Sequence, residues 1–248
     1  DLPRRAQPFF GRHPWVFAGA IARTPAGLHP GDEVALVSDQ GEFIARGLFN
    51  PHSAIRVRLY NWLPEISLDE VFWRHRLEQA ITLRRDRLKW WGPRTGCRLV
   101  FSEADGLSGL IVDRYGDWLL LQCTSLALYH RRELLVKQLC ELVQPRGIWL
   151  RTEKGIREVE GLETADQLLW GEPPPRPLWI TENSLNFAVD VVEGQKTGFF
   201  LDQRVNRQAF VPLLVPGRLL DVCCFSGGFA LNAARDPRIT GVVGVDVS

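Results

Sequence analysis

The sequence of 248 residues contains no methionine and few cysteines, and its charges almost cancel. The cysteines, at positions 97, 123, 140, 223 and 224, form an odd-numbered set without CxxC spacing, which argues against a disulfide framework and against a zinc ribbon. This thiol usage favours a reducing, cytoplasmic compartment. The histidines show neither HExxH nor paired spacing, so we expect no metal site.

Long apolar runs are also missing. No stretch approaches the roughly 20 apolar residues that cross a bilayer, so we expect no membrane contact. The net charge of +1 means that any basic, nucleic-acid-binding surface must be local. Hydrophobic residues make up 45% of the chain, a globular composition, and the length suggests two or three domains at roughly 100 to 200 residues each.

Short alternating runs between turn sequences predict a small antiparallel β-domain over residues 30–60. In its last run, "AIRVRLY", alternation places Ile55, Val57 and Leu59 on a core face and Arg56 and Arg58 on a cationic face. A solvated strand face and a phosphate-contacting face are equally good interpretations of these two arginines.

The middle of the chain predicts an α+β unit. Ser67 with Glu70 resembles a capping box, and apolar residues at helical spacing predict a helix over 68–91, which is also the most basic segment. Strand-like runs with turns at 105–106 and 115–117, a helix over 128–143 and a strand at "GIWLR" follow. Glu103 and Asp105 are more typical of turn formers than of catalytic carboxylates, because Gly106 follows them. The proline-rich stretch "GEPPPRP" at 171–177 is the best linker candidate.

The last segment begins with a predicted hairpin and a helix over 202–214, followed by the strand "RLLDV", the turn "CCFSGG", the helix "FALNAARD" and the strand "GVVGVDVS". This βαβ order predicts parallel strands with a ligand at their carboxyl ends. Asp246 stands where a carboxylate accepts hydrogen bonds from ribose hydroxyls. The turn lacks the GxGxxG glycines that cradle a pyrophosphate, so Asp221 and the Gly227-Gly228 pair suit S-adenosylmethionine better than a dinucleotide. A ligand-free turn is the alternative.

The adjacent cysteines of this turn have two interpretations. Cysteine behaves as a small hydrophobe at packed positions beside such a turn, and this interpretation is favoured. A reactive thiolate would need a cationic or helix-N-terminal environment, which Cys224 could have.

The stretches "GRHPWVFAGAI", "SEADGLSGLIVDRYGDWLLLQ", "GQKTGFFLDQR", "DVCCFSGGFAL" and "GVDVS" resemble, in the same order, the bacterial 23S ribosomal RNA methyltransferases that make 5-methylcytidine. The resemblance implies a multidomain α/β and α+β protein. Its domains would be a β-barrel-like PUA domain (1–66), a central α+β domain (67–177) and the beginning of a Rossmann-type methyltransferase domain (178–248).

The resemblance also implies site residues. Those around S-adenosylmethionine would be Gln203, Arg204, Asp221, Cys223, Phe225, Ser226, Gly227, Gly228, Asp246 and Ser248. Those that help to hold ribosomal RNA would be Arg12, His13, Trp15, Arg56 and Arg58. Packing into the β-domain is an equally good interpretation of Trp15, and a solvated face is the alternative for the basic helix.

Family members continue past the point that matches Ser248 and place their catalytic cysteine there, so we expect a longer natural protein with its nucleophile beyond Ser248. Two other function classes stay open: an RNA-binding module without activity, and a methyltransferase with a small-molecule or protein substrate. The sequence also leaves open whether two copies pair as a homodimer.

Overall fold

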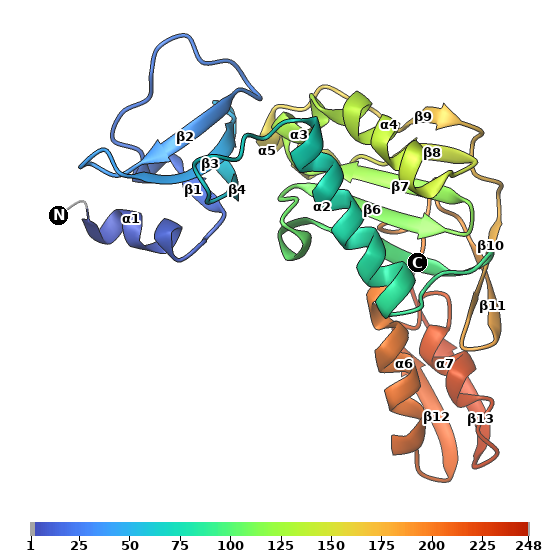
Figure 1. Cartoon of the computed structure of the whole chain (residues 1–248). Coiled ribbons are helices and arrows are strands. Elements are labelled where there is room, and N and C mark those ends of the chain that lie inside the picture. The colour runs from blue at the N-terminus through green and yellow to red at the C-terminus, as the bar shows by residue number, and fades with distance from the viewer. Residues whose placement is uncertain (1–2, 248) are drawn as a thin grey trace.

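The computed structural model describes residues 3–247, whose strands form separate sheets of four, five, two and two strands. Figure 1 shows the N-terminal sheet at the left, the five-stranded sheet at the upper right and the C-terminal strand pair below it. No helix among the described residues is long and apolar enough to span a membrane. The same residues contain no cluster of His, Cys, Asp or Glu that could hold a metal ion.

The N-terminal sheet is antiparallel, with the strand order β1-β4-β3-β2. Its elements are α1 (Pro3–Phe10), β1 (Trp15–Phe17), η1 (Ala18–Ala20), β2 (Glu33–Val37), β3 (Phe43–Phe49) and β4 (Ile55–Asn61). Val57 and Leu59 of β4 are buried in a core with Val16 and Ile44, as the alternation of side chains along a strand predicts. The predicted small antiparallel β-domain is therefore confirmed.

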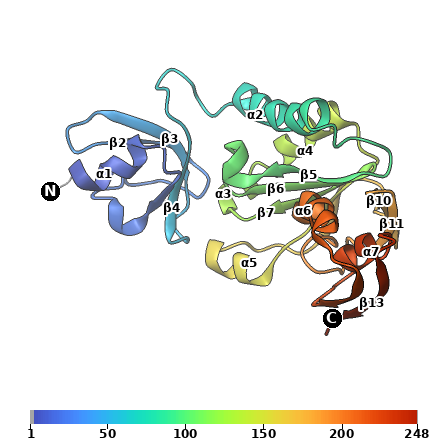
Figure 2. The ribbon, with the colours of Figure 1, turned by 90° about the horizontal axis from the view of Figure 1, so that it is seen from below.

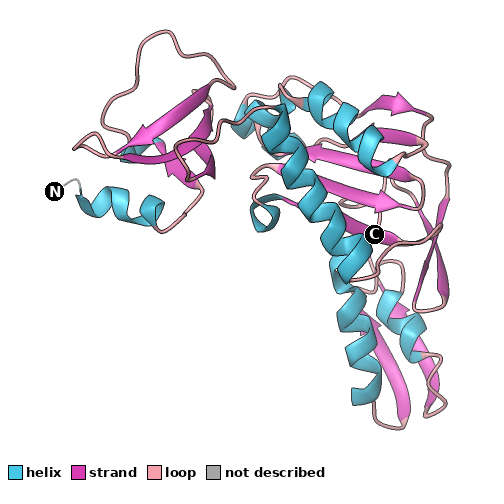
Figure 3. Ribbon diagram, viewed as in Figure 1, coloured by secondary structure: helices cyan, strands magenta, loops and turns pink. Residues whose placement is uncertain are grey.

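A five-stranded sheet with the order β5-β6-β7-β8-β9 forms the central part, and only β7 and β8 are parallel. Its strands are β5 (Gly96–Phe101), β6 (Leu110–Tyr115), β7 (Trp118–Cys123), β8 (Gly147–Leu150) and β9 (Gln167–Gly171). The helices of this part are α2 (Glu70–Thr82), η2 (Leu83–Arg87), η3 (Ser102–Asp105), α3 (Leu126–Tyr129), α4 (Arg132–Val143) and α5 (Lys154–Glu160). Figure 2 shows α2 and α4 on one face of the sheet. Figure 3 gives the same arrangement by element type.

The helix α2 has a different N-cap residue from the predicted one. The residue that caps the helix is Asp69, whose carboxylate accepts a hydrogen bond from the backbone N–H of Phe72 at 2.9 Å. Ser67 lies before the helix, so it does not form the predicted capping box with Glu70. An aspartate at the N-cap provides the same acceptor for an unpaired amide of the first turn.

The hairpin of β10 (Leu178–Glu182) and β11 (Leu185–Val189) covers the other face of the central sheet. Ile180 and Phe187 are buried in one cluster with Tyr115 and Leu120 of that sheet. The proline-rich segment 171–177 therefore joins two elements of one packed unit. The predicted domain boundary at residue 177 falls between β9 and β10, but the hairpin after it shares a hydrophobic cluster with the central sheet before it.

The C-terminal part contains the predicted βαβ unit, in which β12 (Gly217–Val222) and β13 (Ile239–Val245) pair in parallel and α7 (Gly228–Ala233) connects them. The helix expected over 202–214 is a series of shorter turns: η4 (Leu201–Gln203), α6 (Arg204–Phe210) and η5 (Val211–Leu213). Pro212 lies inside that range and, lacking an N–H group, favours a break in the regular helix.

Candidate functional site

The carboxyl ends of β12 and β13 meet at the turn 223–227, where the sequence places the cofactor. The backbone N–H groups of Cys223 and Cys224 donate to the carbonyl of Val245 at 2.8 and 3.2 Å. Asp246 follows directly, and its Oδ2 accepts a hydrogen bond from the N–H of Phe225 at 2.6 Å. The structure thus brings Asp246 and the turn together, as expected. Ser248, also predicted at this site, lies outside the described residues.

Asp221, at the end of β12, is half-buried and faces the connecting helix. Its Oδ2 accepts the backbone N–H of Ala230 at 3.0 Å. This hydrogen bond uses one of the free amides at the start of α7 and fixes the helix to the strand. Asp221 therefore stabilises the strand-to-helix connection through this hydrogen bond, and its contact with a cofactor stays a prediction.

The turn is held in backbone conformations that most residues avoid. The φ angles of Cys223, Phe225 and Gly227 are 61°, 47° and 74°, in the left-handed region that favours glycine. Gly228 is required for a different reason, because a Cβ atom there would lie 2.6 Å from Nε of the buried Arg207. Non-glycine residues in such conformations cluster at ligand sites.

Two residues that were not predicted as site residues hold the turn: Phe200, just before η4 and α6, and Arg207 of α6. The rings of Phe200 and Phe225 pack edge to face, with centroids 5.2 Å apart. Arg207 donates to the carbonyl of Phe200 at 2.7 and 3.0 Å. Burial lowers the pKa of Arg207. The carboxylate of Glu182, whose Oε1 lies 3.4 Å from Nε of Arg207, acts in the opposite direction and raises it. Phe200 lies within "GQKTGFFLDQR", so its position in that motif was the available signal.

The hydrogen bonds of Gln203 and Arg204 are made with residues outside the turn 223–227. Arg204 pairs with Glu182 at 3.3 Å and donates to the carbonyl of Gly96 at 2.5 Å, with its guanidinium over the ring of Trp90. It thus connects α6 to the central sheet, and the cofactor contact that the resemblance implies for Arg204 stays a prediction. Gln203 bonds with its neighbours Asp202 and Asn206.

All five cysteines are free thiols. Burial raises the pKa of Cys97 to about 11 and that of Cys123 to about 12, so neither is a thiolate at neutral pH. Cys224 is half-buried and packs against β13, where a Cβ atom on Gly244 would lie 3.0 Å from its Sγ. This contact supports the interpretation of Cys224 as a packing residue.

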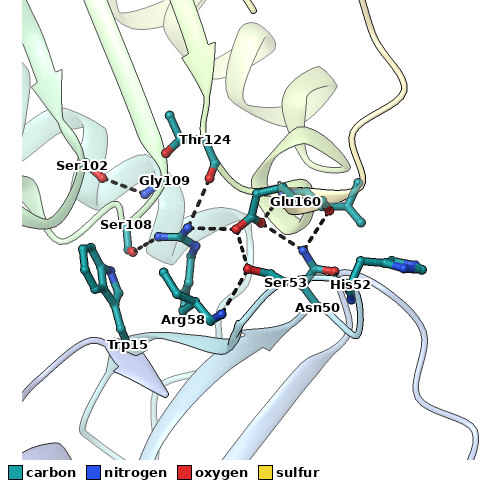
Figure 4. A network of polar contacts seen from close by, with 12 residues as sticks. Trp15, Asn50, His52, Ser53, Arg58, Ser102, Ser108, Gly109, Thr124 and Glu160 are labelled. Atoms are coloured by element: carbon teal, nitrogen blue, oxygen red, sulfur yellow. Dashed lines mark hydrogen bonds and ion pairs between the residues drawn. The ribbon is translucent and has the colours of Figure 1, made fainter. Parts of the chain in front are cut away.

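Figure 4 shows that Arg58 lies at the junction between the N-terminal and central parts rather than on a solvated face. Its side chain is 9% exposed and pairs with Glu160 at 3.1 Å and with Glu103 at 3.5 Å. It also donates to the hydroxyl of Ser108 at 3.3 Å and to the carbonyl of Thr124 at 3.2 Å. With its donors engaged inside the protein, Arg58 is a junction residue, which corrects its assignment to the RNA surface.

Trp15 also contributes to the junction. Its indole Nε1 donates to Glu103 at 2.8 Å, and the same carboxylate accepts from Ser108 at 2.7 Å. Burial of Glu103 disfavours its charged form, but these hydrogen bonds outweigh burial and lower its pKa below the ordinary 4.5. Glu103 and Asp105 lie in the helical turn η3, as predicted for turn formers.

The other predicted RNA-binding residues are more accessible. Arg12 and His13 are exposed, and Arg12 adopts a left-handed φ of 64°. Arg56 is half-buried and donates to the carbonyl of Pro51. Nothing in the structure tests an RNA contact of these three residues, so their roles stay predictions.

Comparison with known proteins finds a domain model that matches the N-terminal part. Residues 2–62 match a family model described as a PUA-like domain. The first part of the chain is a PUA-like domain. It comprises the antiparallel sheet β1–β4 described above.

Curated relatives match nearly the whole chain. Two are named ribosomal RNA large subunit methyltransferase I: one from Escherichia coli O139:H28, 36% identical over 247 residues, and one from Erwinia tasmaniensis, 36% identical over 249 residues. Each match covers 98% of this chain and 61% of the relative. The chain therefore spans about three fifths of the length of these relatives.

Solved structures confirm the fold class. A Streptococcus mutans chain described as a SAM-dependent methyltransferase superposes with a TM-score of 0.79 at 20% identity, covering 98% of this chain and 61% of that one. A chain described as a methyltransferase complexed with SAH superposes with the same TM-score, identity and coverage. The arrangement of a PUA-like domain, a central α+β unit and a βαβ unit is thus shared with methyltransferase structures.

Proposed function

We propose that this protein is an S-adenosylmethionine-dependent methyltransferase that acts on large-subunit ribosomal RNA and forms 5-methylcytidine. The observation that carries the proposal is the closure of the turn 223–227 onto Asp246, where Phe225 donates to the carboxylate at 2.6 Å. A carboxylate at the end of the second strand of a βαβ unit is the group that receives ribose hydroxyls. The names of the curated relatives support the substrate.

The residues of the turn fit this cofactor better than a dinucleotide. A pyrophosphate needs several glycines that let its oxygens approach the backbone, whereas Cys223, Phe225 and Ser226 stand at those positions here. Asp246 would hold the ribose, and the residues from Cys223 to Gly228 would surround the rest of the molecule. When bound, S-adenosylmethionine supplies an electrophilic methyl group.

The RNA substrate would be held by the PUA-like domain. The exposed Arg12 and His13 offer a cation and an aromatic ring beside the junction, and Arg56 adds a second guanidinium. In the 5-methylcytidine chemistry that we propose, a thiolate adds to C6 of the base, so the base must be accessible or flipped out of a helix. We assign that thiolate to none of the described cysteines.

Methyl transfer tests the proposal. Labelled S-adenosylmethionine is incubated with this protein and with ribosomal RNA from cells that lack the enzyme. We expect label in 5-methylcytidine of the large-subunit RNA and none in the absence of RNA. Transfer without RNA would point to a small-molecule or protein substrate, and RNA binding without any transfer would favour a non-catalytic binding module.

A further inference from the structure

The segment 190–200, which we call the anchored loop, connects β11 to η4 and is fixed to the central sheet by buried side chains. The Thr197 hydroxyl donates to Oδ2 of Asp113 at 2.6 Å and lies 3.2 Å from the hydroxyl of Tyr115. Asp113 is fully buried and forms a two-pronged pair with Arg98 at 2.9 and 3.0 Å. A buried carboxylate with its acceptors engaged in this way defines the position of Thr197 closely.

The first half of the anchored loop is held from a second strand. Arg151, just after β8, donates to the carbonyl of Val191 at 2.8 Å and to that of Gly194 at 3.2 Å. Its Nε pairs with Asp166 at 3.1 Å, which orients the guanidinium. The loop is therefore fixed on both sides of residues 195 and 196.

Lys196 is the exposed residue between these two anchors. It adopts a left-handed φ of 51°, and its Nζ lies 4.3 Å from the centre of the Phe200 ring. The Phe200 ring also contacts that of Phe225, in the turn that we assign to the cofactor. A lysine held in an unfavourable backbone conformation by the surrounding structure is the kind of outlier that occurs at ligand sites.

The ammonium of Lys196 has no ion pair within residues 3–247. The two arginines of α6 have partners within the protein, since Arg204 pairs with Glu182 and Arg207 donates to the Phe200 carbonyl. The turn itself carries the carboxylates of Asp221 and Asp246. An anionic ligand group beside these carboxylates needs a cation to offset their repulsion, and Lys196 offers one.

We propose that Lys196 is a cofactor-binding residue whose ammonium pairs with the carboxylate at the amino-acid end of S-adenosylmethionine. This inference rests on the proposed function, because it assumes that the turn 223–227 holds that cofactor. The central domain then contributes to the cofactor site through the anchored loop, with Asp113 and Arg151 as positioning residues. The carboxylate is the single anionic group of the cofactor, which makes its removal a specific test.

The test is calorimetric titration of the protein with two ligands that share adenosine and a thioether. S-adenosylhomocysteine has the amino-acid carboxylate, and 5′-methylthioadenosine lacks it. We expect Lys196→Gln to weaken the first ligand roughly five- to tenfold, within the range between an exposed ion pair and a charge-assisted hydrogen bond. The affinity for the second ligand should not change, and Lys196→Arg should recover most of the loss.

Lys89→Gln is the matched control, because Lys89 is also exposed and left-handed, with a φ of 57°. It should leave both affinities unchanged. The inference would be wrong if Lys196→Gln bound S-adenosylhomocysteine as tightly as the original protein, or if it lost the same affinity for both ligands. Neither result would contradict the proposed function. A loss of RNA affinity with unchanged cofactor affinity would overturn it in favour of a phosphate contact. If the original protein bound neither ligand, the proposed function would fall together with the inference.

Discussion

Glu160 shows at the residue scale how a buried charge can join separate parts of the chain. Its carboxylate accepts hydrogen bonds from Asn50 and Ser53 of the PUA-like domain at 3.0 and 2.7 Å. It also pairs with Arg58 and accepts the backbone N–H of Leu126 at 3.2 Å. Because these donors come from both domains, the side chain fixes the orientation of one domain on the other (Figure 4).

Replacing this carboxylate should destabilise the protein strongly. In Glu160→Ala, Arg58 would stay buried with only part of its charge compensated, which typically costs about 3 to 5 kcal/mol. Urea unfolding measures the loss. Glu158→Ala, an exposed residue of the same helix, should change the free energy of unfolding by less than about 0.5 kcal/mol. Similar losses for both variants would contradict the assigned role of Glu160.

The sequence predicted the faces of β4 but not what would cover them. Alternation correctly separated Val57 and Leu59 from Arg58. It could not show that the polar face of Arg58 meets a second domain, because the partner Glu160 lies more than 100 residues later. Long-range contacts of this kind leave no local pattern, so alternation alone leaves a solvated face and a phosphate-contacting face as equally good interpretations of Arg58.

At the scale of elements, the strand pair β12–β13 has one apolar face that the described residues do not cover. Leu220, Val222, Val243 and Val245 are between 44% and 63% exposed, and the register places Leu220 beside Val243 and Val222 beside Val245. The opposite face packs against α7, which in turn contacts α6 (Figure 2). A contiguous exposed apolar face favours association.

We therefore expect the 248-residue chain to associate as its concentration rises. The double variant Leu220→Thr with Val243→Thr retains strand-favouring residues and should reduce this association, as measured by sedimentation velocity. Val71→Thr, at a single exposed position on α2, is the control and should not change it. A chain that stays monomeric at all concentrations would argue against an adhesive face.

The contact between β1 and η3 should be sensitive to acid. Glu103 has a folded-state pKa below its ordinary 4.5, so its contribution to stability is fully present above that value and is lost as the pH falls through the lower folded pKa. Urea unfolding as a function of pH should show this loss in the original protein. Glu103→Gln should flatten that part of the profile, and an unchanged slope would mean that other carboxylates dominate it.

At the scale of the whole molecule, the order of domains was accessible from the sequence, while their packing was not. Turn sequences and alternation predicted the N-terminal sheet, and the βαβ unit was evident from two apolar strands around a Gly-Gly turn. The hairpin β10–β11 was expected to start the last domain, yet its Ile180 and Phe187 are buried against the central sheet. A proline-rich connector indicates a stiff segment but not which core its neighbours join.

RNA binding should depend on accessible cations outside the junction. The double variant Arg12→Ala with Arg56→Ala should reduce RNA affinity and lower the slope of log affinity against log salt by up to about 1.4 to 1.8, the value of two phosphate contacts. Fluorescence anisotropy with a labelled ribosomal RNA fragment measures both. Arg74→Ala is the control, because Arg74 is already paired with Glu78 and Glu141. An unchanged slope in the double variant would leave Arg12 and Arg56 as solvated residues.

The central claim is that the turn 223–227 and Asp246 form an S-adenosylmethionine site, and calorimetric titration of the protein tests it most directly. We predict that the protein binds S-adenosylmethionine more tightly than NAD. Asp246→Ala should weaken that binding by about 1.5 to 3 kcal/mol, the range for hydrogen bonds to charged groups, while RNA affinity is maintained. Tighter binding of NAD, or an Asp246→Ala variant that binds S-adenosylmethionine as well as the original protein, would contradict the account.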